Sequence, residues 1–408
     1  MFLTSKSEKN ILYILKNYKE YINANKIKVS DKKLIEKIFN LLHESVLASK
    51  KIVHKNNQIN DNDIIIREIE NLSKGKYFPE DIYNYLNEYI NYKFSYNIKF
   101  NNCNIDIDFY SVINDKNEIN KIYKYLNKYI KLVKSWLFIC NFYSRKKIKN
   151  LNIKIFFTPF IKKLPNEDNT FKKSVLSSFH VNTGYTHYGY DDKKKNIVIY
   201  RKEEWFKVFI HETIHAFDLD FNTIDPRKYN NLFKQEFKYV DSDFNFNEAY
   251  CEFWADIMNL SYYSYDYSNG NINHFLLSFQ INISLEKIFS TMQLNKILNY
   301  YNLNYDIVIS NDEANNQIIK NIYKEDSNVF CYYILKSILL FNYDKVFQWC
   351  NKNNLNFIQF KLSEENINKF LKLLFSLKNN KKFKSTIHNT KHVINNNNLE
   401  MCLFEYSM

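Results

Sequence analysis

The chain has 408 residues, 45% of them hydrophobic, which is enough to bury a large core in one or two domains. The formal net charge is +13, but the lysines are spread along the whole chain, so nucleic acid is not expected as the main partner. The six cysteines include no Cys-x-x-Cys pair, which argues against a disulfide framework and favours a reducing, intracellular compartment.

The N-terminus has no apolar core of signal-peptide length, and no uncharged apolar stretch approaches the length of a membrane span. We therefore expect neither secretion by a signal peptide nor a transmembrane helix.

Residues 1–95 are predicted to form helices joined by polar turns, because sets such as Ile11, Ile14 and Leu15 have helical spacing. The region 96–149 follows, with a β-pair and a long helix. Alternation at 98–100 and 105–109 predicts the two strands.

The long helix is predicted at about 118–143, where apolar residues form a stripe. A strand at 153–157 then opens a third region, at 150–260, in which the chemistry of the chain is concentrated.

The last region, 261–408, is predicted to be a helical subdomain. The segments 275–289 and 328–341 are apolar enough to be buried helices. A flexible polar loop is expected near 378–399, where lysine and asparagine dominate, and 400–404 is expected to return as a terminal strand.

The third region contains His211-Glu212-x-x-His215 inside a segment that is apolar nearly all round. Residues four apart share a face of a helix, so the two imidazoles can bind one Zn²⁺. Glu212 lies beside them, where it can take a proton from a water at the metal. The alternative is a core helix whose histidines are only hydrogen-bonded. Glu203 and Glu204 precede the motif and are expected in the first turn of its helix.

A second segment places Glu248, Glu252 and Asp256 at intervals of four residues among apolar neighbours. An acidic stripe on a buried helix is costly unless it meets a cation. A zinc ion held by His211 and His215 would be that cation.

These two segments resemble the gluzincins, metallopeptidases in which a His-Glu-x-x-His helix is followed by a helix that carries Asn-Glu-(Ala/Gly). Asn247-Glu248-Ala249 matches the second element, which implies Glu248 as the third ligand. The resemblance places Glu252 and Asp256 around the ligands, with Glu252 steadying a histidine. In the alternative register Glu252 is the ligand and Asp256 its outer partner. Glu248 follows His215 by 33 residues, a longer gap than is usual in the family.

The order of elements before the motif strengthens the resemblance. A strand-like run around Asn182, Gly184 and Tyr185 is followed by a polar turn at 191–195, a strand at 196–200 and the motif helix. In zincins an edge strand of this kind binds the substrate backbone, so these three residues are expected to bind substrate. The arrangement also resembles uncharacterised metallopeptidase-like proteins of large DNA viruses, which implies a host cytoplasm or a virion as the location.

Tyr332 and Tyr333 are further candidates, because zincins often place a tyrosine against the developing oxyanion. Their alternative role is that of packed aromatic residues with hydroxyls at the rim of the core.

Together these features predict an α+β chain with a zincin-like catalytic core within a mostly helical protein. The expected activity is that of a zinc metallopeptidase acting on peptides or proteins. The alternatives are an inactive zincin-like scaffold, for example a virion or host-interaction protein, and a basic nucleic-acid-associated protein with a structural zinc.

Overall fold

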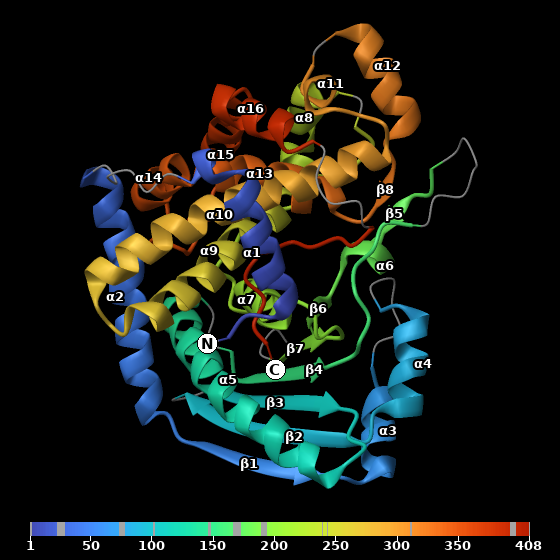
Figure 1. Cartoon of the computed structure of the whole chain (residues 1–408), viewed down its shortest axis with the longest axis vertical. Helices are drawn as coiled ribbons and strands as arrows, with labels where there is room; N and C mark the ends of the chain where they lie inside the picture. The colour runs from blue at the N-terminus through green and yellow to red at the C-terminus, as the bar shows by residue number, and fades with distance from the viewer. Residues whose placement is uncertain are drawn as a thin grey trace.

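The computed structural model describes residues 2–22, 29–72, 78–100, 103–145, 148–165, 173–188, 194–238, 240–242, 244–310, 312–391 and 397–407. Its architecture is mixed, as predicted: a twisted sheet is covered by helices, and helices make up most of the chain (Figure 1).

The main sheet has the strand order β1-β2-β3-β4-β7-β6 among the described residues. Its strands are β1 (His54–Ile59), β2 (Tyr92–Phe100), β3 (Cys103–Ser111), β4 (Asn150–Phe156), β6 (Gly184–Tyr188) and β7 (Lys194–Ile199). The pairs β1–β2, β2–β3 and β6–β7 are antiparallel, whereas β3–β4 and β4–β7 are parallel. A small parallel pair joins β5 (Leu176–Ser177) to β8 (Glu325–Asp326). The predicted regions 1–95, 96–149 and 150–260 therefore share one sheet, and β1 lies in the region predicted to be helical.

The helices of the first half are α1 (Ser5–Asn17), η1 (Lys19–Tyr21), α2 (Val29–Lys51), α3 (Asn62–Glu70), α4 (Glu80–Tyr89), α5 (Lys116–Tyr143), α6 (Ser178–Val181) and α7 (Trp205–Ala216). Those of the second half are α8 (Arg227–Glu236), α9 (Phe246–Ser268), α10 (Ile272–Tyr300), α11 (Tyr305–Val308), α12 (Glu313–Ile322), the π-helix η2 (Phe330–Leu335), α13 (Lys336–Phe341), α14 (Tyr343–Asn353), α15 (Glu364–Leu377) and α16 (Lys381–Asn389). No helix in the described part of the chain combines the length and apolar character needed to cross a bilayer.

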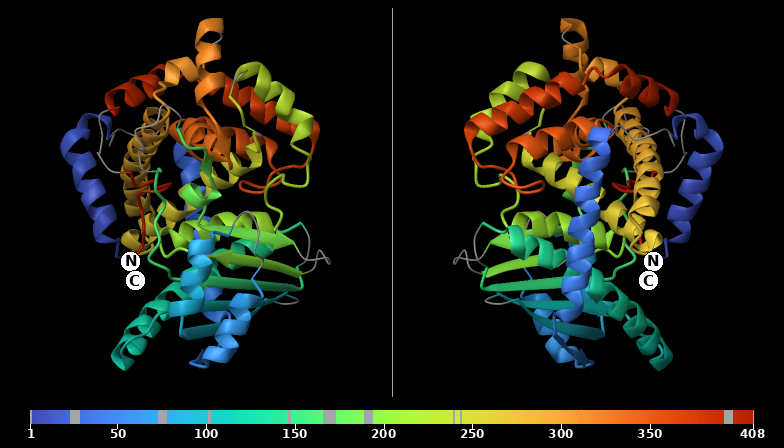
Figure 2. Two further views of the ribbon diagram at one scale, coloured as in Figure 1. Left: turned by 90° about the vertical axis from the view of Figure 1, so that its right-hand side faces the viewer. Right: turned by 90° about the vertical axis from the view of Figure 1, so that its left-hand side faces the viewer.

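The two faces of the sheet belong to different cores because strand residues alternate between them. Ile197 and Ile199 of β7 join the large core that contains α5, α7, α9 and α10, whereas Val198 joins a smaller core under α3 and α4. Figure 2 shows the helices of the C-terminal half stacked on one side of the sheet. Helix α7 lies between the sheet and this stack, and all of its residues are buried.

The chain from 397 to 407, buried throughout 399–404, forms no regular strand, contrary to the prediction for 400–404. Side chains satisfy the amides at its centre, and backbone groups of Phe2, Thr4, Lys162 and Leu164 bond to residues near its two ends. The amides of Met401 and Cys402 donate to Oε1 of Glu204 at 2.7 and 3.0 Å, and the amide of Leu403 donates to Glu286. Its β-pairing is limited to isolated bridges in the described structure, Leu3 with Tyr406 and Lys163 with Asn398.

The predicted flexible loop near 378–399 is also wrong for residues 381–389. Helix α16 occupies 381–389, capped by the Asn380 side chain and anchored by the buried residues Phe383 and Ile387. Residues 392–396 lie outside the described residues. So do residues 191–193 of the predicted polar turn, whereas Lys194 and Lys195 belong to β7.

Candidate metal centre

Helices α7 and α9 bring two histidines and one glutamate together. Nε2 of His211 lies 3.0 Å from Nε2 of His215, and 3.2 Å from Oε2 of Glu248. Nε2 of His215 lies 3.6 Å from Oε1 of Glu248. The two histidines share a face because they are four residues apart on α7, and Glu248 comes from the first turn of α9.

This donor set fits a zinc ion. Ligands at about 2.0–2.2 Å around a tetrahedral zinc stand roughly 3.3–3.5 Å from one another. The three observed separations fall on either side of that value. Within the described residues the group of close ligand atoms at this point has three protein members, which leaves one tetrahedral position for a water or a substrate.

The electrostatics of the centre favour a cation. Burial by itself would lower the pKa of His211, but Glu252 and Glu248 outweigh this effect and raise the pKa to about 9. The pKa of Glu248 is held below its usual range, because the two histidines outweigh the opposing effect of burial. Carboxylates that stabilise a proton here would also stabilise a metal ion.

Glu252 contacts the outer nitrogen of His211. Its Oε1 lies 2.8 Å from Nδ1, off the direction of the ring N–H, so the contact is an ion pair without hydrogen-bond alignment. Lys207, one turn before His211 on α7, pairs with the other oxygen of Glu252. Glu252 therefore lies on the opposite side of the His211 ring from Glu248, and it is the carboxylate of Glu248 that meets the two Nε2 atoms.

His215 has an outer partner that the sequence analysis missed. Nδ1 of His215 lies 2.5 Å from Oδ2 of Asp220, and Asn247 donates to the same oxygen at 3.0 Å. The chain leaves α7 through Asp218, whose φ of 53° turns it back and directs Asp220 toward the ring. An acidic residue five positions after the second histidine was the signal in the sequence.

Cys251 lies behind this contact, with its Sγ 3.5 Å from Oδ2 of Asp220 and 3.7 Å from Nδ1 of His215. Burial raises the pKa of the thiol well above its ordinary value. The thiol therefore stays protonated and acts as a packed hydrophobe with a weak hydrogen bond.

Asp256 does not lie around the ligands, contrary to the prediction. Asp256 lies one turn beyond Glu252 on α9, where it forms a buried ion pair of 2.7 Å with Lys336 of α13. Burial raises the pKa of Asp256 to about 6, against the opposing effect of Lys336. The four-residue interval drifts around the helix, so the third carboxylate of the stripe faces α13 and not the histidines.

Glu212 faces the edge strand. Its Oε2 accepts a hydrogen bond of 2.6 Å from Oγ1 of Thr186, on β6. Burial raises the pKa of the carboxyl above its ordinary value. A general base benefits from such a shift, because a more basic carboxylate takes a proton more readily near neutral pH. Thr186 was not predicted as a site residue.

The predicted substrate-binding residues have different surroundings. Gly184 packs against α7: a Cβ there would stand 2.8 Å from the carbonyl oxygen of Val198 and 3.1 Å from Val208. Tyr185 points to the other face of the sheet and makes an edge-to-face contact with Phe78. The absence of a side chain at Gly184 allows close packing on α7, and the Tyr185 ring packs on the other face, so the backbone edge of β6 is what remains for a substrate.

Asn182 precedes β6 and accepts a hydrogen bond of 3.2 Å from Ser327. In the described structure β6 pairs with β7 alone, so its other edge has no strand partner there.

The hydroxyls of the two predicted tyrosines lie in different surroundings. Tyr332 donates to Oε2 of Glu248 at 3.2 Å, so its hydroxyl lies at the metal centre. The hydroxyl of Tyr333 is buried and has no hydrogen-bond partner in the described structure. Both belong to the π-helix η2, and neighbouring residues on a helix point in different directions.

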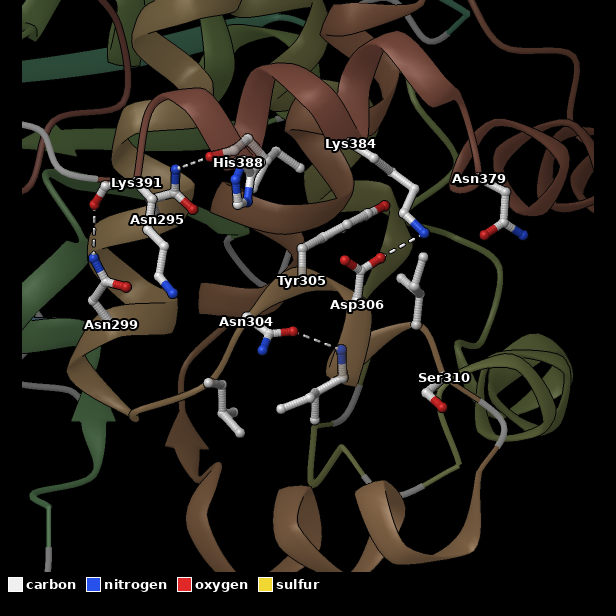
Figure 3. Close-up of a pocket in the computed structure, with 14 residues that line it drawn as sticks. Asn295, Asn299, Asn304, Tyr305, Asp306, Ser310, Asn379, Lys384, His388 and Lys391 are labelled. Carbon is white, nitrogen blue, oxygen red and sulfur yellow. Dashed lines mark hydrogen bonds and ion pairs between the residues drawn. The ribbon is translucent and has the colours of Figure 1, made fainter.

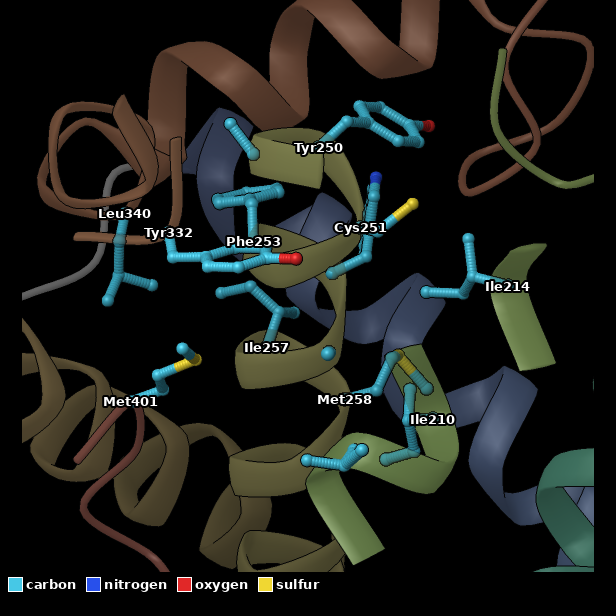
Figure 4. Packing of buried hydrophobic residues seen from close by; sticks show 14 of the residues in the cluster. Ile210, Ile214, Tyr250, Cys251, Phe253, Ile257, Met258, Tyr332, Leu340 and Met401 are labelled. Atoms are coloured by element: carbon cyan, nitrogen blue, oxygen red, sulfur yellow. The ribbon is translucent and has the colours of Figure 1, made fainter. Parts of the chain in front are cut away.

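Apolar side chains hold this arrangement in place. Figure 4 shows the packing between α7, α9 and the C-terminal half, with Ile210, Ile214, Tyr250, Cys251, Phe253, Ile257, Met258, Tyr332, Leu340 and Met401 labelled. The side chains of His211 and His215 are 6% and 10% exposed, so the centre is nearly closed to solvent.

A separate cavity of about 680 Å³ lies between α10, α11 and α16 (Figure 3). Its lining is polar, but several of the lining side chains already form ion pairs or hydrogen bonds within the protein. Lys384 pairs with Asp306 at 2.5 Å, and Asn295 donates to the carbonyl of Ile387. It contains no residue of the metal centre.

Comparison with models of known families, with curated proteins and with solved structures found no match to this chain. The functional argument therefore rests on the geometry of the centre.

Proposed function

We propose that this chain is a zinc-dependent metallopeptidase of the gluzincin type. The observation that carries the proposal is the meeting of the Nε2 atoms of His211 and His215 with the carboxylate of Glu248, with Glu212 on the same helix. Each outer nitrogen of the two rings also has a carboxylate beside it, as metal-binding histidines require.

His211, His215 and Glu248 would hold the zinc. Bound zinc supplies a Lewis acid that acidifies water and polarises a carbonyl group. Asp220 and Glu252 orient the imidazoles so that Nε2 points inward on both.

Glu212 would move the proton. One carboxylate oxygen is held by Thr186, which leaves the other to take a proton from the attacking water and to pass it to the leaving amine. The hydroxyl of Tyr332, already directed at the ligand carboxylate, is placed to stabilise negative charge that develops on the carbonyl oxygen.

The open tetrahedral position supports catalysis over a structural role. A structural zinc site closes its shell with a fourth protein ligand, and the group at this centre has three in the described residues. A residue in the place of Glu212 also has no function in a purely structural site.

The test compares wild type with Glu212→Gln, which removes the base and keeps the shape. We expect one zinc per chain in both, and cleavage of a mixed quenched-peptide library by wild type only. The matched control is Glu70→Gln, an exposed glutamate at the end of α3, which should cleave like wild type. Chains without bound zinc would refute the proposal, and so would cleavage by Glu212→Gln at the wild-type rate.

A further inference from the structure

Arg201 is a buried arginine with an incomplete set of partners. The residue is 2% exposed and lies between the end of β7 and the start of α7. Its Nη2 donates to the carbonyl of Phe179, but Nε and Nη1 have no hydrogen-bond partner in the described structure. A buried guanidinium edge without acceptors is costly, so its presence calls for a ligand.

The nearest carboxylates are already engaged elsewhere. Glu203 pairs with Lys6 at 2.9 Å and with Lys162 at 3.5 Å, and Glu204 pairs with Lys162 at 2.6 Å. Lys6 also pairs with Glu400, so the two lysines are shared among three carboxylates. Glu203 and Glu204 still act on the charge of Arg201, but neither forms an ion pair with it in the described structure. Its positive charge is left without a direct counter-ion among the described residues.

Two tyrosine hydroxyls that interact electrostatically with this guanidinium lack partners as well, one from each core: Tyr200 belongs to the smaller core under α3 and α4, and Tyr333 to the large core. The Arg201 guanidinium carbon is 6.0 Å from the centre of the Tyr200 ring, and the hydroxyls of Tyr200 and Tyr333 are both buried without hydrogen bonds in the described structure. The charge of Arg201 acts on the pKa of both tyrosines, which burial raises. A guanidinium group and two hydroxyl groups can all donate hydrogen bonds to one carboxylate.

The position of this group relates it to the edge strand. The amide of Tyr200 donates to the carbonyl of Thr183, and Gly184 pairs with Ile199, so Arg201 lies beside the N-terminal end of β6. Antiparallel pairing is the more stable arrangement for an added strand. A substrate paired in this way runs opposite to β6 and brings its C-terminal residues to Arg201.

We propose that Arg201, with the hydroxyls of Tyr200 and Tyr333, binds the C-terminal carboxylate of the peptide substrate. This inference rests on the proposed peptidase function and narrows it to removal of a short C-terminal fragment. Seven residues of helix separate Trp205 from Glu212, a rise of roughly 10 Å. Two or three extended residues span that length, which sets the size of the fragment.

The test measures binding apart from turnover. Zinc-loaded Glu212→Gln is dialysed against three pools of N-acetylated random hexapeptides, and the bound peptides are quantified by mass spectrometry. The first pool has a free C-terminal carboxylate, the second a C-terminal amide, and both lack Asp and Glu. The third is amidated and contains one internal Asp or Glu.

We expect the first pool to bind roughly 10- to 100-fold more tightly than the other two, the contribution of charged hydrogen bonds to one carboxylate. Arg201→Met in the Glu212→Gln background should remove this preference. Arg201→Lys should lose most of it, because an ammonium group has no planar fork. Arg227→Met, at a side chain that is 88% exposed, is the matched control and should leave it unchanged.

Equal binding of the first two pools would overturn the proposal, and so would equal binding of the first and third, which would make an acidic side chain the ligand. If Arg201→Met does not fold, the proposal is tested by Arg201→Lys and by the binding of the three pools to the protein with Arg201 intact. Wild type that holds zinc but cleaves none of the pools would refute the peptidase function, whereas the preference for free carboxylates would still report on Arg201.

Discussion

Oδ2 of Asp220 lies 2.5 Å from Nδ1 of His215, so a residue just beyond α7 fixes the orientation of a ring within it. Asn247, next to Glu248 on α9, holds the same oxygen at 3.0 Å. The carboxylate thus joins the two helices that carry the metal centre.

Asp220→Asn should lower zinc affinity about 10- to 100-fold, because the ring loses a charged acceptor that makes Nε2 a better ligand. Competition with a chromophoric chelator measures this affinity. Asp225→Asn, which removes an exposed acidic residue paired with Arg227, is the control and should bind zinc like wild type. An unchanged affinity in Asp220→Asn would show that the contact does not tune the ligand.

Lys207 and Glu252 form a fully buried pair behind His211. Lys207→Met should lower the free energy of unfolding by roughly 3–5 kcal/mol, because it leaves a buried carboxylate without its cation. Denaturant unfolding measures the loss.

A double-mutant cycle with Glu252→Gln isolates the interaction of this pair. The exposed pair of Lys228 and Glu364 offers the comparison, with an expected coupling below about 1 kcal/mol. A similarly small coupling between Lys207 and Glu252 would contradict the proposed support of His211.

Gly184→Ala should destabilise the protein by about 1–3 kcal/mol, since the new methyl group meets the β7 backbone at 2.8 Å and Val208 of α7 at 3.1 Å. Thermal unfolding detects the change, and activity should fall with it as β6 shifts from Glu212. Gly270 has open space around it and a φ of 79°, so Gly270→Ala should cost about 1 kcal/mol through the backbone alone and spare activity. Equal losses of activity in the two variants would argue against the close contact.

Tyr332→Phe and Tyr333→Phe separate two neighbouring hydroxyls. Tyr332→Phe should lower kcat about 10- to 100-fold with KM nearly unchanged, since its hydroxyl lies at Glu248 and would act on the transition state. Tyr333→Phe should leave kcat nearly unchanged and raise KM for peptides with a free C-terminus. Steady-state kinetics on one peptide and its amide measure both effects. The reverse pattern would exchange the two roles.

Lys296 makes stability depend on pH. Burial, helped by the charge of Lys6, lowers its pKa from 10.5 to about 8. Between those values the unfolded chain keeps a proton that the folded chain has lost, so the free energy of unfolding rises with pH. Below pH 8 Lys296 is protonated in both states, so the buried charge lowers the free energy of unfolding by its full amount.

Lys296→Met should therefore flatten the increase in stability between pH 8 and 9.5, as measured by denaturant unfolding at several pH values. Lys320→Met removes an exposed lysine and should keep the wild-type slope. If Lys296→Met keeps that slope too, the lysine is not the group responsible.

The two histidines proposed as ligands were accessible to sequence analysis because their relation depends on local geometry. A four-residue spacing places His211 and His215 on one face of any helix. The acidic stripe on a second buried helix indicated that a cation lies nearby, and the resemblance to gluzincins singled out Glu248, with Glu252 as the alternative. The strand order around β6 and β7 followed from alternation and from the helix after it.

The outer contacts depend on how distant segments meet. Asp220 reaches His215 only because the chain reverses at Asp218, and Asp256 turns to Lys336 because α13 packs on that side of α9. Glu203 and Glu204 were expected in the first helical turn, but α7 begins at Trp205, and they pair with Lys162 from a distant loop.

The sequence by itself determined the helix that carries the motif, the pairing of His211 with His215 and the mixed architecture, since these follow from periodicity within short segments. Only the tertiary structure decided which carboxylate meets the ligand atoms, which tyrosine reaches them and that Arg201 is left without an acceptor. Those outcomes depend on the packing of α7, α9, η2 and the chain near the C-terminus, which are far apart in the sequence, and no local pattern encodes the angle at which such segments meet.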